Sequence, residues 1–380
     1  MDAPLIADPI PLAQALMRAR SITPHDAGAL DIAEAALTGI GFRVRRYKFG
    51  VVDNLYARFG EARPNFCFAG HVDVVPPGEN WSSDPFAAEI RDGVLYGRGA
   101  TDMKTAIAAM ITATETFLRN SKPRGSISFL LTCDEEGPAV EGTKPTLAAL
   151  AAEGEALDHC LVGEPTSEDR VGDVIKNGRR GSLNVVITME GKQGHVAYPQ
   201  RALNPVTPLL EALSALKARQ LDEGAPGFDA SNLEITSVDV GNPAHNVIPA
   251  RAAAKLNIRF NTTHSGEALF AWIEQTANAR AAQAGVACDL RIVSQSVPFY
   301  TPPGPFTDLI VQAVRETFGH APRLATTGGT SDARYIKDYC PVAELGLRNA
   351  TAHMADEHCA VEDVRTLARC YEAVLRRYFE

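Results

Sequence analysis

No Cys-x-x-Cys pair occurs among the seven scattered cysteines of this sequence. An odd number of cysteines without regular spacing indicates reduced thiols, and therefore a cytoplasmic protein. Cys133 stands beside an acidic run, and we expect it to be a small buried hydrophobic residue rather than a ligand or a nucleophile. The N-terminus has no basic segment followed by an apolar one, and no apolar run approaches the roughly 20 residues that span a bilayer. We therefore expect neither a signal peptide nor a membrane partner.

Excess positive charge is absent as well. The chain has 37 lysines and arginines against 46 acidic residues, for a formal net charge of −9, which argues against nucleic-acid binding. A small anionic substrate remains compatible with this net charge, because arginines near a binding site can make the site itself positively charged. No repeat or low-complexity segment occurs, and 380 residues are too many for one ordinary core, so two domains are expected.

Three short apolar runs, 66–70, 126–132 and 157–163, each end in acidic or imidazole side chains. Short apolar runs are typical of buried strands, and α/β sheets usually hold their sites at the carboxyl ends of such strands. The other expected strands and the helices, which are predicted from apolar periodicity, cover 42–49, 54–59, 182–190, 233–238, 252–260 and 290–293 (strands) and 11–17, 26–40, 104–118, 205–219 and 265–284 (helices).

The composition of the sequence and the order of its predicted elements change after residues 176–181. A strand, a helix, two strands, a helix and a strand follow, which predicts a small α+β sandwich with its helices on one face. This domain is inserted, because acidic and imidazole residues return near the C-terminus. We predict a discontinuous catalytic domain, 1–179 and 294–380, and an inserted domain, 180–293.

Five clusters together contain the inventory of a two-metal hydrolase. They are Gly70-His71-Val72-Asp73, Gly99-Ala100-Thr101-Asp102-Met103-Lys104, Asp134-Glu135-Glu136-Gly137, Gly163-Glu164-Pro165-Thr166 and Thr351-Ala352-His353-Met354. Their number and order carry the prediction, because each cluster alone has a simpler interpretation.

The simpler interpretations stay open residue by residue. His71 and Asp73 are two apart, so on a strand the Asp73 carboxylate could hydrogen-bond the far nitrogen of His71, or both could sit in a surface turn. Asp102 precedes a helix and could be its N-cap. Glu135 and Glu136 repel each other unless a cation or a shared proton relieves them, or else they lie in a solvated loop. The lone histidines elsewhere are expected to make routine polar contacts.

In this order the clusters resemble the zinc aminoacylase–carboxypeptidase superfamily, over essentially the whole chain. Further segments resemble one branch of it, the succinyl-diaminopimelate desuccinylase family. These segments are Lys176-Asn177-Gly178-Arg179-Arg180-Gly181-Ser182, Gln193-Gly194-His195-Val196-Ala197-Tyr198-Pro199, Asn246-Val247-Ile248-Pro249, Gly328-Gly329-Thr330-Ser331-Asp332 and Asn349-Ala350-Thr351.

The resemblance implies an α/β fold: a zinc-hydrolase catalytic domain with a mixed central sheet flanked by helices, plus an inserted α+β dimerisation (lid) domain. It implies two Zn²⁺ ions per subunit, with Co²⁺ as a substitute. The implied metal ligands are His71 and Glu164 at one ion, Glu136 and His353 at the other, and Asp102 between them.

The remaining implied roles concern proton transfer and substrate contacts. Glu135 would be the general base and acid, Asp73 would orient His71, and His195 would reach across a homodimer to the partner's active site. Arginines bind carboxylates bidentately, although any one arginine could instead form an ordinary surface ion pair. The candidate substrate contacts are Arg179, Arg180, Tyr198, Asn246, Arg259, Gly329, Thr330, Ser331 and Asn349.

The implied reaction is removal of succinate from N-succinyl-LL-2,6-diaminopimelate, in lysine and diaminopimelate biosynthesis. Alternatives are an acetylornithine deacetylase or a carboxypeptidase-like amidohydrolase with the same metal ligands, or an inactive, metal-stabilised protein that binds a small anion. Two departures from the family pattern, Ala333 in place of glycine and Met354-Ala355-Asp356 in place of Lys-Val-Asn, touch no implied metal ligand.

Overall fold

The structure of the protein is a computed structural model that describes residues 8–380. The expectation of no signal peptide concerns the N-terminal segment, and residues 1–7 of that segment lie outside the described residues. The chain divides into unit 1 (residues up to 177, 301–325 and 331–380) and unit 2 (178–300 and 326–330). The predicted boundary after residue 293 would cut a ten-residue strand, Ala287–Ser296, that belongs wholly to unit 2.

The helices of the described residues are α1 (Pro9–Arg18), α2 (Ala29–Gly39), α3 (Lys104–Asn120), α4 (Thr143–Ala152), α5 (Val206–Ala218), α6 (Gly266–Ala284), α7 (Pro305–Phe318), α8 (Ala333–Ile336), α9 (Val361–Phe379) and the 3-10 helix η1 (Pro199–Arg201). The strands are β1 (Arg43–Phe49), β2 (Val52–Phe59), β3 (Asn65–His71), β4 (Glu89–Arg91), β5 (Val94–Tyr96), β6 (Ser126–Thr132), β7 (His159–Val162), β8 (Val174–Lys176), β9 (Gly178–Arg179), β10 (Gly181–Glu190), β11 (Gly194–His195), β12 (Asn232–Asp239), β13 (Val247–Ile248), β14 (Arg251–Phe260), β15 (Ala287–Ser296), β16 (Phe299–Tyr300), β17 (Arg323–Ala325), β18 (Val342–Glu344) and β19 (His358–Ala360).

Unit 1 is built on a mixed sheet with the order β1-β2-β6-β3-β7-β18-β8-β17. Its central strands β6, β3, β7 and β18 run parallel, and every residue of β6 is buried. The buried apolar runs predicted from the sequence are therefore the strands of this sheet. Because β3 and β6 are paired in parallel up to His71 and Thr132, the loops that follow them leave the same edge side by side.

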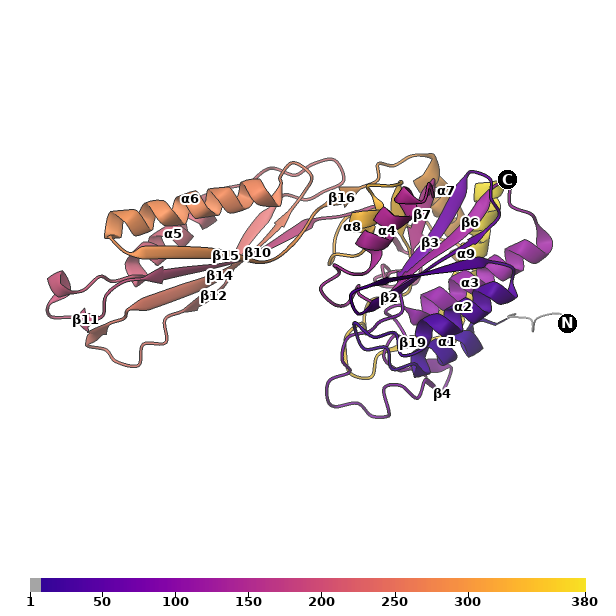
Figure 1. Cartoon of the computed structure of the whole chain (residues 1–380), viewed down its shortest axis with the longest axis horizontal. Coiled ribbons are helices and arrows are strands. Elements are labelled where there is room, and N and C mark those ends of the chain that lie inside the picture. Colours follow the sequence, from indigo (N-terminus) through magenta and orange to yellow (C-terminus); the bar gives the residue numbers. More distant parts are fainter. Residues whose placement is uncertain (1–7) are drawn as a thin grey trace. The chain divides into compact units, whose positions relative to one another are not determined.

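Helices α1, α3, α7 and α9 contribute to one hydrophobic core with this sheet, and α9 lies against α3 and α7 (Figure 1). Helix α4 instead contacts α8 and β6. No helix between residues 8 and 380 has the length and apolar character that crossing a bilayer would require. The mixed sheet flanked by helices confirms the predicted fold of this unit.

Unit 2 has an antiparallel sheet with the order β12-β14-β10-β15, and helices α5 and α6 lie on one of its faces (Figure 1). The side chains between helices and sheet form a separate core, which includes Leu183, Ile187, Leu213, Leu256 and Ile273. This is the α+β arrangement that the alternating strands and amphipathic helices predict. Strands β12 and β15 are the two edges of the sheet.

Candidate metal centre

His71 is the last residue of β3, and its imidazole is 1% exposed. Its Nδ1 lies 2.9 Å from the backbone carbonyl oxygen of Asp73, so Nδ1 carries a proton and Nε2 points toward carboxylates. Nε2 is 3.1 Å from Oδ1 of Asp102 and 3.8 Å from Oε1 of Glu164. Although burial opposes protonation, the carboxylates of Asp102, Asp73 and Glu164 raise the pKa of His71 well above its usual value.

Asp73 orients His71 through its main chain and not, as the sequence suggested, through its side chain. The nearest carboxylate oxygen is 3.7 Å from Nδ1 of His71, beyond hydrogen-bond distance. The reason is that β3 ends at His71, so the alternation of a strand does not extend to Asp73. The Asp73 carboxylate instead accepts the backbone N–H groups of Glu135 (3.4 Å) and Glu136 (3.1 Å), and burial raises its pKa to about 6.

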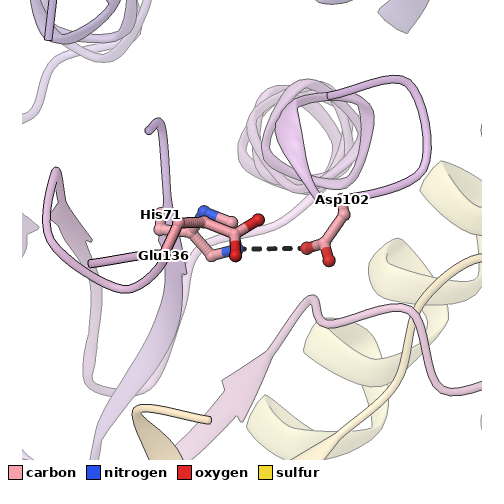
Figure 2. A group of neighbouring side chains, drawn as sticks. All are labelled: His71, Asp102 and Glu136. Atoms are coloured by element: carbon pink, nitrogen blue, oxygen red, sulfur yellow. Dashed lines mark hydrogen bonds and ion pairs between the residues drawn. The ribbon is translucent and has the colours of Figure 1, made fainter. Parts of the chain in front are cut away.

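Asp102 lies between the two imidazoles of the centre. Its Oδ1 is 3.1 Å from Nε2 of His71, and its Oδ2 is 3.3 Å from Nε2 of His353. Figure 2 shows Asp102 directed toward His71 and Glu136 from a position just before helix α3. The N-cap alternative is wrong, because the cap residue of α3 is Met103 and no side chain caps that helix. Burial opposes ionisation of Asp102, but the two imidazoles hold its pKa below its usual value.

His353 and Glu136 form the second side of the centre. Nε2 of His353 is 2.9 Å from Oε1 of Glu136, whose side chain is 7% exposed, while that of His353 is 50% exposed. His353 has a left-handed backbone with φ of 61°, which occurs in few non-glycine residues. Hydrogen bonds with Asp102 and Glu136 raise the pKa of His353 to about 10.

Glu135 and Glu164 complete the cluster. Glu164 follows strand β7 and is buried, and Glu135 follows β6 and is half-buried. Donor atoms of His71, Glu135 and Glu164 lie within 4.8 Å of one another, as do those of His71, Asp102 and Glu136. Desolvation by the surrounding protein, and next the neighbouring charge of Glu164, raise the pKa of Glu135 well above its usual value.

This donor set fits metal ions. Within residues 8–380, both clusters of three or more potential ligands with donor atoms this close contain His71. Several carboxylates held together repel one another unless cations compensate them. Imidazole nitrogen with carboxylate oxygen is a common ligand combination for Zn²⁺ and related transition metals. One carboxylate with an oxygen toward each imidazole is also the arrangement that two ions sharing a ligand require.

In unit 2, His195 pairs through its main chain with Val247, and its imidazole is exposed. Its Nδ1 accepts the N–H of Ala197 at 3.1 Å, so a neutral ring carries its proton on Nε2 and can donate there. The ring of Tyr198 lies 5.8 Å from that of His195, and Asn246 is exposed nearby, where its carbonyl accepts the N–H of Val196.

The three predicted arginines all belong to unit 2. Arg179 is buried and donates to the carbonyl of Gly329 at 3.1 Å, and Arg180 donates to Oδ1 of Asn232 at 3.1 Å. Arg259 lies on strand β14, where it is paired with Ser182 of β10. Burial, and next the positive charge of Arg180, lower the pKa of Arg259. Arg180 bonds the side chain of Asn232, which is the strand partner of Arg259.

The remaining predicted contacts differ in their exposure. Asn349 is exposed, and its N–H donates to the carbonyl of Ser167 at 3.0 Å. Thr330 belongs to unit 2, like Gly329. Ser331 is fully buried in unit 1, and its hydroxyl donates to the carboxylate of Glu344. That hydroxyl is engaged inside the protein, and the substrate contact of Ser331 stays a prediction.

Sequence reasoning missed three polar residues close to the centre. Asp332 is the last residue of the glycine-containing segment 328–332; it is buried, its Oδ1 has no hydrogen-bond partner among residues 8–380, and its charge acts on Glu135. Arg98 and Glu357 are a buried ion pair that reaches both Asp102 and the residue after His353. The signals available in the sequence were an acidic residue in a glycine-rich segment and an arginine directly before the Asp102 cluster.

Known proteins match this chain over most of its length. The model of peptidase family M20/M25/M40 matches residues 67–377. The succinyl-diaminopimelate desuccinylase of Maricaulis maris is 56% identical over 379 residues, which cover 99% of this chain and 97% of that protein. The protein of the same name from Caulobacter vibrioides is 58% identical over 375 residues, covering 98% of this chain and 96% of that one.

Two solved structures share the fold over nearly the whole chain. The aminopeptidase PepT of Bacillus cereus aligns with a TM-score of 0.80 at 20% identity, covering 98% of both chains. The YXEP protein of Bacillus subtilis, described as a dinuclear metal binding peptidase, aligns with a TM-score of 0.72 at 16% identity, again covering 98% of both. The predicted fold and the predicted resemblance are confirmed. This chain belongs to peptidase family M20/M25/M40.

Proposed function

We propose that this protein is a two-metal hydrolase that removes succinate from N-succinyl-LL-2,6-diaminopimelate. The observation that carries the proposal is the position of Asp102, with one oxygen toward His71 and the other toward His353. The relatives named succinyl-diaminopimelate desuccinylase, at 52–58% identity over nearly the full chain, support this choice of substrate. No observation favours the deacetylase or carboxypeptidase alternatives.

In the proposed centre, His71 and Glu164 would hold one Zn²⁺, Glu136 and His353 would hold the other, and Asp102 would serve both. Co²⁺ is the proposed substitute. When bound, such ions would polarise the scissile carbonyl and bring the pKa of a shared water molecule to about 7. The chain itself supplies the orientation: Asp73 holds Nδ1 of His71 with its carbonyl and receives the N–H groups of Glu135 and Glu136.

Glu135 is the proposed general base and acid. Its carboxylate lies within 4.8 Å of donor atoms of His71 and Glu164, so it faces the centre. It would accept a proton from the attacking water and deliver that proton to the leaving amine. A group with both tasks must remain beside the reacting atoms, and the bonds from the Glu135–Glu136 main chain to Asp73 keep it there.

The proposed substrate carries several carboxylates. Arg180 and Arg259, which have Asn232 as a common neighbour in unit 2, are the proposed anion contacts, together with Arg179. Two neighbouring cations repel each other, and a carboxylate between them relieves this repulsion. Tyr198, Asn246, Gly329, Thr330 and Asn349 are proposed as further contacts.

We propose that the protein acts as a homodimer in which His195 of one subunit serves the site of the other. Unit 2 supports a dimer because its edge strand β15 exposes Ile292 (41%) and Val293 (56%), and helix α5 exposes Leu210 (49%). An edge strand with exposed apolar side chains is suited to pairing with a second copy. The free state of all seven cysteines agrees with a reducing, cytoplasmic location.

The test is hydrolysis of N-succinyl-LL-2,6-diaminopimelate by the zinc-loaded protein, measured as the release of succinate. N-acetylornithine is assayed in parallel. We expect turnover of the succinyl substrate and a much lower kcat/KM for N-acetylornithine. The matched variant is Glu135→Gln, which keeps the side-chain shape but cannot accept a proton. It should retain both metals and lose most of kcat, by roughly 10²–10⁴-fold. Faster hydrolysis of N-acetylornithine by the native protein would overturn the substrate assignment.

A further inference from the structure

Arg98 and Glu357 form an ion pair that is sealed from solvent. Nη1 of Arg98 lies 2.8 Å from Oε2 of Glu357, and their side chains are 2% and 0% exposed. Arg98 precedes the Asp102 cluster, and Glu357 follows the His353 cluster 259 residues later. Removing two charges from water is costly, and well-packed apolar side chains often stabilise a protein as well or better. Stability alone is therefore a weak reason for this pair.

The Glu357 carboxylate is bound almost entirely by the main chain that leads to Asp102. Its Oε1 accepts the N–H groups of Thr101 at 2.8 Å and Asp102 at 3.0 Å. Its Oε2 accepts the N–H of Gly99 at 3.2 Å in addition to Arg98. Three main-chain bonds over four residues fix the path of this loop, and with it the position from which the Asp102 side chain extends.

Arg98 connects the same carboxylate to the loop of His353. Its Nη1 also donates to the carbonyl of Met354, the residue after His353, at 3.2 Å. Its Nη2 donates to the carbonyl of Pro77 at 3.1 Å, and its guanidinium lies 5.2 Å from the ring of Trp81. The fork of the guanidinium is thus held on several sides.

A second bridge joins the two loops. The hydroxyl groups of Thr101 and Thr351 lie 3.1 Å apart, and both are also bonded to the carbonyl of His358. The loop that carries Asp102 and the loop that carries His353 are therefore one bonded unit, centred on Glu357. Glu357 is not among the potential ligands of the centre, and the guanidinium of Arg98 has no acceptor atom with which to bind a metal ion.

We propose that Arg98 and Glu357 are positioning residues that hold Asp102 and His353 at the spacing at which both can bind metal. The inference rests on the proposed metal centre. Groups that orient metal ligands by hydrogen bonds commonly change metal affinity by 10–100-fold when they are substituted. Because Asp102 serves both ions in the proposed centre, loss of Glu357 lowers the affinity for both. Because Arg98 acts on the His353 loop, loss of Arg98 lowers mainly the affinity for the ion beside His353.

The experiment measures both metal dissociation constants of the full-length protein by competition with a zinc-binding dye, together with the visible spectrum of the Co²⁺-loaded protein. In Glu357→Gln, an NH₂ group replaces one of the two oxygens, so two N–H donors lose their acceptor in either orientation. We expect both constants to rise on the order of 10–100-fold, and the Co²⁺ spectrum to change.

The matched control is Glu155→Gln. Glu155 is a nearly buried carboxylate, bonded to Arg58 and Arg45 beside β1 and β2, and it is not among the potential ligands. This variant should lower the melting temperature without changing metal affinity. Affinities within twofold of the native protein in a folded Glu357→Gln would overturn the inference.

If Glu357→Gln does not fold, the metal affinity of the Arg98→Lys variant tests the inference instead. Lysine keeps the charge opposite Glu357 but cannot reach the Met354 carbonyl at the same time, so the ion beside His353 should bind at least about tenfold more weakly. Unchanged affinity for both ions in Arg98→Lys would overturn the inference. A native protein that binds fewer than two ions would instead contradict the proposed metal centre, so the two failures are distinguishable.

Discussion

At the scale of single residues, the structure separates two ways in which a side chain can serve the centre. Asp102 and His353 present their own polar atoms to it, whereas Asp73 serves through its carbonyl and through the N–H groups that its carboxylate receives. The sequence predicted that these residues belong together, because their types and order match a known pattern. It could not predict which atom of Asp73 faces His71, because that depends on where β3 ends.

Substitution of Asp102 and of His353 should have different effects on metal content. Asp102 has an oxygen toward each imidazole, so Asp102→Ala should lose most of both metals. His353→Ala should lose mainly one, so the metal content per chain should fall to about half that of the native protein. Elemental analysis after dialysis measures this. His159→Ala is the control, because His159 bonds the Tyr378 hydroxyl outside the centre. Full retention of both metals in His353→Ala would contradict the assignment.

Asp222 in unit 2 should make stability depend on pH. Burial opposes its ionisation, but hydrogen bonds from Ser231, Gly224 and His264 hold its pKa at about 2. A folded-state pKa below the unfolded value means that the stabilisation is present above pH 4 and is lost as the pH falls toward 2. Asp222→Asn should therefore reduce the free energy of unfolding by about 1–2 kcal/mol at pH 7, and by less at pH 3.

Denaturant unfolding of the native protein and Asp222→Asn at both pH values measures this difference. The control is Asp239→Asn, which removes an exposed carboxylate of β12 that bonds Ser237. A loss in Asp222→Asn of equal size at pH 7 and pH 3 would show that the charge of Asp222 is not the cause.

At the scale of elements, length and burial decide what a sequence can predict. The seven-residue strand β6 is wholly buried, and its predicted bounds agree with the structure. Strands β8, β17 and β18 have three residues each, too few for a period to show, although they complete the central sheet. Helix α9 was not predicted, although its buried apolar residues recur at helical spacing.

Gly346, which follows β18, should be sensitive to a single methyl group. A Cβ at this position would lie 2.4 Å from the carbonyl oxygen of Glu164 and 2.5 Å from that of Gly163. The chain cannot easily move away, because the N–H and carbonyl of Gly346 are bonded to the side chains of Thr166 and Ser167. We expect Gly346→Ala to cost about 1–3 kcal/mol of stability and to weaken the ion held by Glu164. Native metal affinity and native stability together would contradict this.

At the scale of the whole molecule, the ligands come together from five segments between residues 71 and 353, and unit 2 lies between them in the sequence. A pattern of types and order is enough to gather such residues in one prediction. The hydrogen bonds and ion pairs that hold these ligands in place cannot be predicted from such a pattern. The pair of Arg98 and Glu357 spans 259 residues, and no local periodicity links the two positions. Such pairs are fixed by the folded backbone and are visible only there.

The two units should respond differently to metal. All five proposed metal ligands belong to unit 1, whereas unit 2 has a core of its own made of its own residues. A ligand stabilises the state that binds it, by about 4 kcal/mol at a thousandfold excess over its dissociation constant. For a unit of this size, that corresponds to a shift of the melting temperature of roughly 8–16 °C. Calorimetry with zinc and with a chelator should therefore show two transitions, of which only one moves. If both transitions shift equally, the stability of unit 2 depends on unit 1, and the separate core of unit 2 is not enough to hold it folded.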